Sequence, residues 1–346
     1  MTTLYDISQT GKERPWRAHK RLAGELLNVY RELSCDPDKL EYYKSKINSL
    51  RNCGEYLQFI QCPQNHQEAQ RLKQAYFCKQ RLCPMCQWRR SLFTFHDFLS
   101  VAHRAQENNP GIQFVLITLT AKNVPGDQLH DEISHYMASY ERLCRYKAFK
   151  QSIIGTYRTF EITANEERND FHPHFHIIGA VNKSYFTNHY IKHDQLMNMW
   201  RKAFQIDYDP NVDIRKVKKK NRNTQTVLEE IKTYNESSHK EAIAQAAAEV
   251  AKYSVKVGDM LRQKNRKEVV ETLDSVLRNR RFISYGGILN DARKELKAEK
   301  KIQEIENSDL VNVSNEEKIC ACPICQSELI HAQYIWNNKK TDYFKL

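Results

Sequence analysis

The stretch Phe171-His172-Pro173-His174-Phe175-His176-Ile177-Ile178 determines how this chain is interpreted, because polar and apolar residues alternate in it as in a β-strand. Side chains of a strand alternate between its two faces, so His172, His174 and His176 share one face. Pro173 cannot donate a ladder hydrogen bond, which predicts that it lies at the strand start or at an edge. His174 and His176 are then the pair best held by the sheet, and two neutral imidazoles on one face favour a divalent metal. The alternative is a histidine-containing strand with no ligand role.

A second strand is predicted over residues 153–163, and it carries Glu161. The polar residues 165–170 would join it to the histidine strand as a β-hairpin. Glu161 can then lie opposite the histidines, where one carboxylate and two imidazoles would leave positions open for substrate oxygens. A cross-strand glutamate without a ligand role is the competing interpretation. Residues 111–120 predict a further buried strand, because they are apolar, β-branched and preceded by Asn-Pro-Gly.

The composition indicates a folded, basic protein. Of 346 residues, 40% are hydrophobic and 28% are charged, which argues against global disorder. Lys and Arg total 54 against 42 Asp and Glu, and the resulting net charge of +12 favours a polyanionic partner. The chain has no P-loop motif, so any DNA unwinding would require another protein. No membrane-length apolar run and no signal peptide are visible, so we expect a cytoplasmic protein.

Ten cysteines in such a compartment favour thiols and metal sites over disulfides. The first group predicts a tetrahedral zinc site, with Cys62 as a substitute ligand; its four expected ligands are Cys53, Cys78, Cys83 and Cys86. The tail predicts a second zinc site, whose fourth ligand is left open; its candidates are Cys320, Cys322, Cys325 and His331.

A zinc deaminase is an alternative for the same region, because His66-Gln67-Glu68 resembles the H-x-E motif of that class. That motif needs a proline directly before the first cysteine of its pair. Here Pro84 follows Cys83, so the deaminase interpretation is rejected.

Residues 241–257 predict a helix with an apolar stripe beside a polar patch. The patch consists of Glu249, Lys252, Tyr253 and Lys256. Residues four apart are neighbours on a helix, so Glu249 and Tyr253 can meet. Because the unperturbed pKa of tyrosine is about 10, the flanking lysines would help a phenolate to form. From the helix alone, a tyrosine packed at its edge is the simpler interpretation.

Four motifs, in this order, resemble the plasmid rolling-circle replication initiator (Rep) proteins of bacteria, in the HUH endonuclease superfamily. They are the cysteine block at 77–89, Leu116-Ile117-Thr118-Leu119-Thr120, His172-Pro173-His174-Phe175-His176 and Glu249-Val250-Ala251-Lys252-Tyr253. The resemblance covers residues 50 to 290. The C-terminal tail resembles the family less clearly, and the N-terminal helical segment has no family motif. The resemblance is to the single-tyrosine type with an N-terminal cysteine block.

The resemblance implies an α+β fold with a central antiparallel sheet flanked by helices and a zinc-binding cysteine insert. We expect five regions: an N-terminal helical segment (1–52), a cysteine-rich zinc-binding and DNA-contacting region (53–105), the nicking and joining domain (106–292), a charged helix and linker (293–319) and a C-terminal cysteine knuckle (320–346). The histidines would lie on a central strand and the tyrosine on a facing helix.

The resemblance also implies a mechanism. The protein would bind the double-strand origin, and Tyr253 would attack a phosphate in exposed single-stranded DNA, leaving a 5′-phosphotyrosine and a free 3′-OH. The metal would be Mn²⁺ or Mg²⁺ on His174, His176 and Glu161, with His172 as a further candidate. Host helicase and DNA polymerase would be partners. The sequence leaves the oligomeric state open, a homo-oligomer included.

Three other functions are compatible with parts of this pattern. The first is a non-catalytic, zinc-containing origin-binding protein, which would show neither metal dependence nor a covalent adduct. The second is a transposase or conjugative relaxase of the same superfamily, against which the cysteine block argues. The third is a metal nuclease that uses water instead of tyrosine and leaves free 5′ ends.

Overall fold

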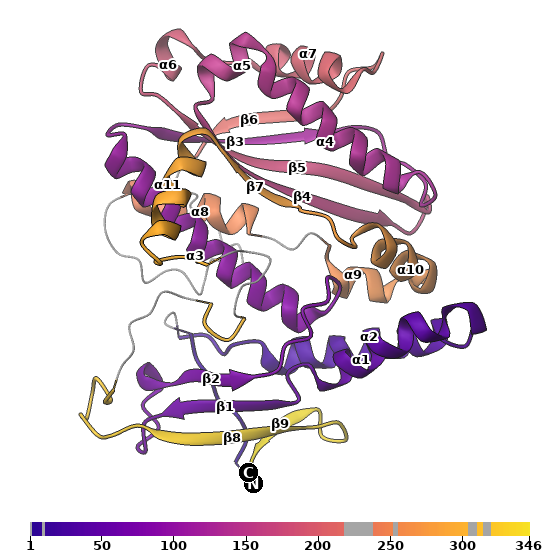
Figure 1. The fold of residues 1–346 in the computed structure, drawn as a ribbon, viewed down its shortest axis with the longest axis vertical. Coiled ribbons are helices and arrows are strands. Elements are labelled where there is room, and N and C mark those ends of the chain that lie inside the picture. The colour runs from indigo at the N-terminus through magenta and orange to yellow at the C-terminus, as the bar shows by residue number, and fades with distance from the viewer. Residues whose placement is uncertain (1, 9–10, 218–237, 252–254, 304–309, 314–319) are drawn as a thin grey trace.

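Two antiparallel sheets and the helices between and around them make up the protein (Figure 1). The structure is a computed structural model that describes residues 2–8, 11–217, 238–251, 255–303, 310–313 and 320–346. The helices among these residues are α1 (Trp16–Leu33), α2 (Leu40–Asn52), α3 (Pro84–Asn108), α4 (Leu129–Arg145), α5 (Lys147–Ser152), α6 (Tyr185–Asn188), α7 (His193–Phe204), α8 (Ser238–Val250), α9 (Val257–Arg262), α10 (Arg266–Val276) and α11 (Gly287–Ala298), with short 3₁₀ turns at Pro37–Lys39 and Gln67–Ala69.

The larger sheet has five strands in the order β6-β3-β5-β4-β7. Its strands are β3 (Gln113–Thr120), β4 (Gly155–Asn165), β5 (Asp170–Val181), β6 (Val212–Lys216) and β7 (Ile283–Gly286). The histidine strand β5 is therefore central, and its predicted hairpin with β4 is confirmed by an unbroken register from Gly155↔Ala180 to Asn165↔Asp170. The α+β class and the flanked antiparallel sheet are confirmed as well.

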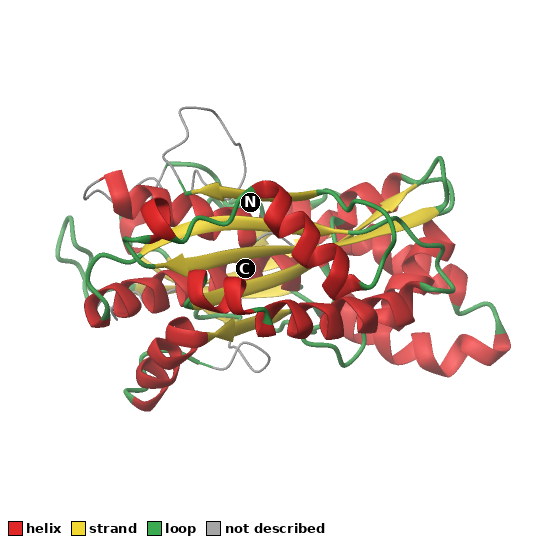
Figure 2. Cartoon of the chain, turned by 90° about the horizontal axis from the view of Figure 1, so that it is seen from above, coloured by secondary structure: helices red, strands yellow, loops and turns green. Residues whose placement is uncertain are grey.

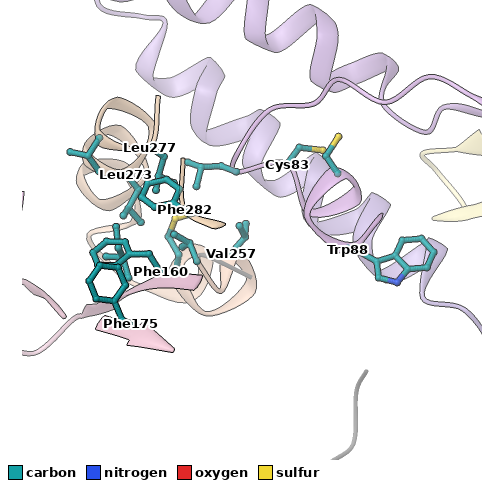
Figure 3. Packing of buried hydrophobic residues seen from close by; sticks show 14 of the residues in the cluster. Cys83, Trp88, Phe160, Phe175, Val257, Leu273, Leu277 and Phe282 are labelled. Atoms are coloured by element: carbon teal, nitrogen blue, oxygen red, sulfur yellow. The ribbon is translucent and has the colours of Figure 1, made fainter. Parts of the chain in front are cut away.

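Helices cover both faces of this sheet (Figures 1 and 2). On one face, Phe160 and Phe175 contact Tyr136 of α4 with ring centroids 5.4 and 5.5 Å away. Figure 3 shows these two phenylalanines side by side near Phe282, whose ring stacks on Phe160 at 5.7 Å. On the other face, Ile178 packs in a separate cluster. That cluster includes Phe98 of α3, Ala247 of α8 and Leu289 of α11.

Strand alternation assigns the histidines to this second face. Ile178 lies on it, and residues two and four positions earlier in β5 share it, namely His176 and His174. The helices α3, α8 and α11 therefore cover the face that carries the histidines. Helix α8 contains Glu249 and Val250 of the tyrosine motif, whereas Tyr253 itself lies outside the described residues.

Pro173 lies within β5, at a point where its missing N–H costs no hydrogen bond. Phe171 exchanges both backbone hydrogen bonds with Val124, on the β3 side. Pro173, two residues on, faces the same side, and β3 pairs only as far as His174. The carbonyl of Pro173 accepts instead from Tyr136 Oη at 2.6 Å. The proline thus marks a local edge, as its chemistry predicts.

The smaller sheet combines residues from the two ends of the chain. Its order is β2-β1-β8-β9, with β1 (Tyr56–Gln61), β2 (Arg71–Ala75), β8 (Ile330–Asn337) and β9 (Asp342–Lys345). The N-terminal segment joins it as well, since Lys345 N donates to Thr2 O at 2.8 Å. The predicted cysteine-rich region and the predicted C-terminal knuckle therefore share one sheet.

The turn between β7 and α11 requires a glycine. Gly287 has φ +55°, and a Cβ there would lie 2.1 Å from the carbonyl oxygen of Ile154. The turn directs α11 back along β4 onto the face that carries the histidines.

Candidate active site

Three side chains from the β4–β5 hairpin meet on the face covered by α3, α8 and α11. Glu161 pairs directly with His174 in the register. Its Oε2 lies 3.5 Å from His174 Nε2 and 3.3 Å from His176 Nε2, and the two Nε2 atoms are 3.1 Å apart. This group, which we call the triad, can hold a metal ion. Two imidazoles and one carboxylate are a donor set for a divalent transition ion such as Mn²⁺.

The remaining ring nitrogens of the triad are held by neighbouring groups. His174 Nδ1 lies 3.2 Å from the carbonyl oxygen of His172, and His176 Nδ1 lies 3.5 Å from Thr118 Oγ1 on β3. With the proton on Nδ1, each Nε2 presents a lone pair towards Glu161. Such second contacts fix the tautomer and orientation of metal-binding histidines. Thr118 was not singled out from the sequence, although its register opposite His176 follows from pairing β3 with β5.

The triad is largely buried. Glu161 is 5% exposed and His174 is 9% exposed. Burial alone would raise the pKa of Glu161, but hydrogen bonds and positive charge from His174 and His176 outweigh it and hold that pKa well below its usual range. The carboxylate is therefore ionised, as a metal ligand must be.

His172, the further candidate ligand, lies beside the triad and is not among the three residues whose ligand atoms converge. Its Nδ1 is 2.8 Å from Asn123 Oδ1, and its ring stacks on His174 with centroids 5.2 Å apart. Burial, followed by the charge of His174, lowers the pKa of His172. The His172 ring supports that of His174, and the His172 carbonyl anchors His174 Nδ1.

The tyrosine motif is described only at its edges. Lys252 and Tyr253 lie outside the described residues, and of Glu249 only the backbone, within α8, is described. Lys256 is the residue directly before α9. Its Nζ lies 3.7 Å from Glu161 Oε1. The sequence placed Lys256 beside the tyrosine; the structure adds its contact with the triad.

The four cysteines of the first predicted zinc site converge. Cys53 ends α2, Cys78 follows β2, and Cys83 and Cys86 lie at the start of α3. The Sγ atom of Cys53 is 3.5 Å from that of Cys83 and 3.6 Å from that of Cys86, and Cys78 Sγ is 3.7 Å from Cys86 Sγ. These separations approach the edge of a tetrahedron with Zn–S bonds near 2.3 Å, about 3.8 Å. The cluster can hold a metal ion.

The second cysteine prediction is corrected. Cys322 and Cys325 gather with Cys62 and His66. Cys320 is exposed and outside the group, and His331 Nδ1 instead contacts Gln58 Nε2 at 3.1 Å. Cys62 therefore does not substitute in the first site. The spacing Cys62-x₃-His66 was the signal in the sequence that could have indicated this pair.

The fold and the triad define an α+β protein with a candidate metal site on its central sheet, and comparison with known proteins identifies the family. The family described as Replication protein matches residues 69–344. The chain is 38% identical over 323 residues to Protein rep of Bacillus amyloliquefaciens, covering 91% of this chain and 90% of that protein. It is 33% identical over 344 residues to Protein rep of Streptococcus pneumoniae serotype 2 (strain D39 / NCTC 7466), covering 99% and 95%. It is 30% identical to Protein rep of Lentilactobacillus hilgardii, covering 99% and 98%.

The chain therefore belongs to the Rep family of plasmid replication initiators. No solved structure matches it. Among the described residues, no helix is both long and apolar enough to cross a bilayer.

Proposed function

We propose that this protein starts rolling-circle replication by nicking one strand of its plasmid origin, with Tyr253 as the nucleophile. The observation that carries the proposal is the convergence of Glu161, His174 and His176 on the sheet face covered by α8. Lys256, three residues after Tyr253 in the sequence, contacts the same carboxylate at 3.7 Å. The tyrosine motif and the triad thus belong to one site.

The chain's own groups define the reaction. Tyr253 Oη would attack the scissile phosphorus, forming a P–Oη bond while the bond to the 3′ oxygen breaks. The 3′ oxygen leaves with a proton as a 3′-OH, and the 5′ side stays attached as a phosphotyrosine. One phosphoester replaces another, so the reverse reaction can rejoin ends without ATP. Lys256 would lower the pKa of a nearby phenolic group by its charge.

The triad fits a divalent ion, because both Nε2 atoms and one ionised carboxylate oxygen face one another in a buried setting. When bound, Mn²⁺ or Mg²⁺ would polarise a phosphoryl oxygen and orient the scissile group. The two imidazoles favour Mn²⁺ over Mg²⁺, which prefers oxygen ligands alone.

Glu249 would act at termination. It precedes Tyr253 by four residues, and a carboxylate at that position could activate a water molecule. Hydrolysis would then end the cycle in place of a second tyrosine transfer. Glu249→Ala should spare initial nicking and impair termination, and equal loss of both steps would contradict this role.

A basic cavity of about 570 Å³ offers a place for the DNA backbone. Its cationic lining consists of Lys46, Lys79, Arg81, Arg278, Arg280 and Arg281. The acid in the lining, Asp274, is already paired with Lys46 at 2.6 Å. The cavity joins α2, the cysteine block and the segment between α10 and β7, so the four-cysteine zinc site would hold part of a DNA-contacting surface in place.

The deciding experiment uses supercoiled plasmid that carries the gene and its flanking DNA, with Mn²⁺ and denaturing gels. Wild type should give nicked plasmid with covalently attached protein, and Tyr253→Phe should give neither. Nicks that persist in Tyr253→Phe without attached protein would indicate water as the nucleophile. Binding without nicking would instead favour the origin-binding protein.

The cysteine block and the family favour a plasmid initiator over a transposase or relaxase. Host helicase and polymerase are the partners that this role requires.

A further inference from the structure

The second cysteine group brings together residues from the two ends of the chain. Cys62 Sγ lies 3.4 Å from Cys325 Sγ and 3.4 Å from His66 Nδ1, and Cys322 Sγ also lies 3.4 Å from His66 Nδ1. All four ligand atoms lie within 4.8 Å of one another. Residues 62 and 325 are 263 positions apart in the sequence. The proposed nicking reaction uses none of these four side chains.

Each half of the group is a tight turn that presents its ligands. In the C-terminal half, Gln326 N donates to Cys322 O at 2.9 Å, and Gln326 adopts the left-handed conformation with φ +58°. In the N-terminal half, Asn65 N donates to Cys62 O at 2.9 Å, and Asn65 has φ +60°. Backbone N–H groups also point at sulfur, since Gln64 N lies 3.3 Å from Cys62 Sγ. Such contacts stabilise thiolates in metal-binding turns.

Apart from the pairing of β1 with β8, the described residues give the two turns little apolar packing. The local apolar cluster contains only Cys62, Ala69 and Cys322, with Cys325 and Leu329 at its edge. Cys62 and Cys322 are nevertheless 0% exposed. A cluster of three small side chains buries little apolar area, so a bound metal ion would supply much of the stabilisation.

We propose that Cys62, His66, Cys322 and Cys325 bind a second structural zinc ion. Three thiolates and one imidazole are a closed tetrahedral donor set for zinc, with no position left for substrate. The site would lie at one end of β1, because Cys62 directly follows Gln61, the last residue of that strand. Cys53 of the four-cysteine site precedes β1, so the strand would run between two zinc ions.

The zinc would fasten the C-terminal hairpin to the N-terminal half. β8 pairs with β1 along its whole length, from Tyr56↔Ile335 to Gln61↔Ile330. At the other end of the hairpin, Tyr343 Oη donates to the carbonyl of Gly54, next to Cys53, at 2.5 Å. Loss of the second zinc should therefore loosen the hairpin. Because Tyr343 contacts Gly54 beside Cys53, this loosening should also disturb the four-cysteine site.

The test counts zinc in the full chain by inductively coupled plasma mass spectrometry, in a His174→Ala, His176→Ala background so that the triad contributes none. The expected count is two per chain, falling to one in Cys322→Ala, Cys325→Ala. The matched control is Cys320→Ala, His331→Ala, which should retain two. One zinc in the parent protein, or loss of zinc in the control, would overturn the proposal.

A second measurement needs no cysteine variant and remains decisive if that variant fails to fold. X-ray absorption at the zinc edge should report an average shell of seven sulfur atoms and one nitrogen over the two sites, as the two ligand groups contain. An all-sulfur shell would contradict the proposal. So would a non-reducing peptide map that finds a disulfide between Cys62 and Cys325.

Discussion

Glu161 lies directly opposite His174 in the β4–β5 register, and its carboxylate approaches both triad imidazoles, at 3.5 Å from His174 Nε2 and 3.3 Å from His176 Nε2. The pairing places the carboxylate on the rigid centre of a sheet, not on a loop. Its position is therefore set by the backbone hydrogen bonds that join β4 to β5. A ligand held in this way needs little reorganisation when a metal binds.

Replacing Glu161 by Gln should remove one negative ligand while keeping the side chain's shape. We expect Mn²⁺ affinity to fall by about 100-fold and nicking to fall with it, because a ligand should matter at least as much as the second-shell groups whose loss costs 10–100-fold. Isothermal titration with Mn²⁺ and a nicking assay measure the two effects. The matched control is Glu167→Gln, in the exposed hairpin link, which should change neither. Unchanged Mn²⁺ affinity in Glu161→Gln would remove Glu161 from the metal site.

Alanine variants of His172 and His174 distinguish a residue beside the triad from a metal ligand within it. His174→Ala should abolish measurable Mn²⁺ binding, since one of three ligands is lost. His172→Ala should weaken it by no more than about 10-fold, because the carbonyl that anchors His174 remains on the backbone. Titrations of the two variants under the same conditions make the comparison. Equal loss in both would restore His172 as a ligand.

The basic cavity predicts a change in salt dependence. Arg278 is exposed and lines the cavity, so Arg278→Ala should weaken binding to duplex origin DNA and reduce the slope of log K against log salt by about 0.9 if one phosphate contact is lost. Lys44→Ala is the control, because Lys44 is exposed, pairs with Glu41 on α2 and does not line the cavity. Fluorescence anisotropy at several salt concentrations gives both slopes. An unchanged slope in Arg278→Ala would show that DNA does not use this cavity.

The parts of the site that the sequence predicts are those encoded by local patterns. Alternation in β5 places His174 and His176 on one face, and the short polar link fixes the β4 register that brings Glu161 opposite them. In each case the neighbours in space are neighbours in sequence, so spacing alone carries the information.

Contacts between distant segments were not predictable in this way. Nothing in the tail indicates that Cys322 and Cys325 would meet Cys62 and His66, because that depends on β8 pairing with β1. The prediction used the nearest available ligands instead, Cys320 and His331, which point elsewhere. The contact of Lys256 with Glu161 is not predictable for the same reason, since the two residues lie far apart in the sequence.

Acid should destabilise the protein through His19, a residue of α1 that stacks on Trp88 of α3 with ring centroids 5.3 Å apart. Burial lowers the pKa of His19 from 6.5 to about 4. Between pH 6.5 and about pH 4, His19 is therefore protonated in the unfolded chain and neutral in the folded protein. The free energy of unfolding consequently falls as the pH drops through this window. The full contribution is present above about pH 6.5 and lost below about pH 4, for a total of up to about 3 kcal/mol at 1.36 kcal/mol per pKa unit.

His19→Phe keeps an aromatic ring against Trp88 and removes the titrating group. Urea unfolding at a series of pH values should therefore show a weaker loss of stability between pH 6.5 and 4 in His19→Phe than in wild type. His130→Phe, at an exposed position of α4, is the control and should retain the wild-type pH dependence. If His19→Phe follows the wild-type curve throughout, the acid sensitivity of the protein originates elsewhere and the α1–α3 contact does not depend on a neutral His19.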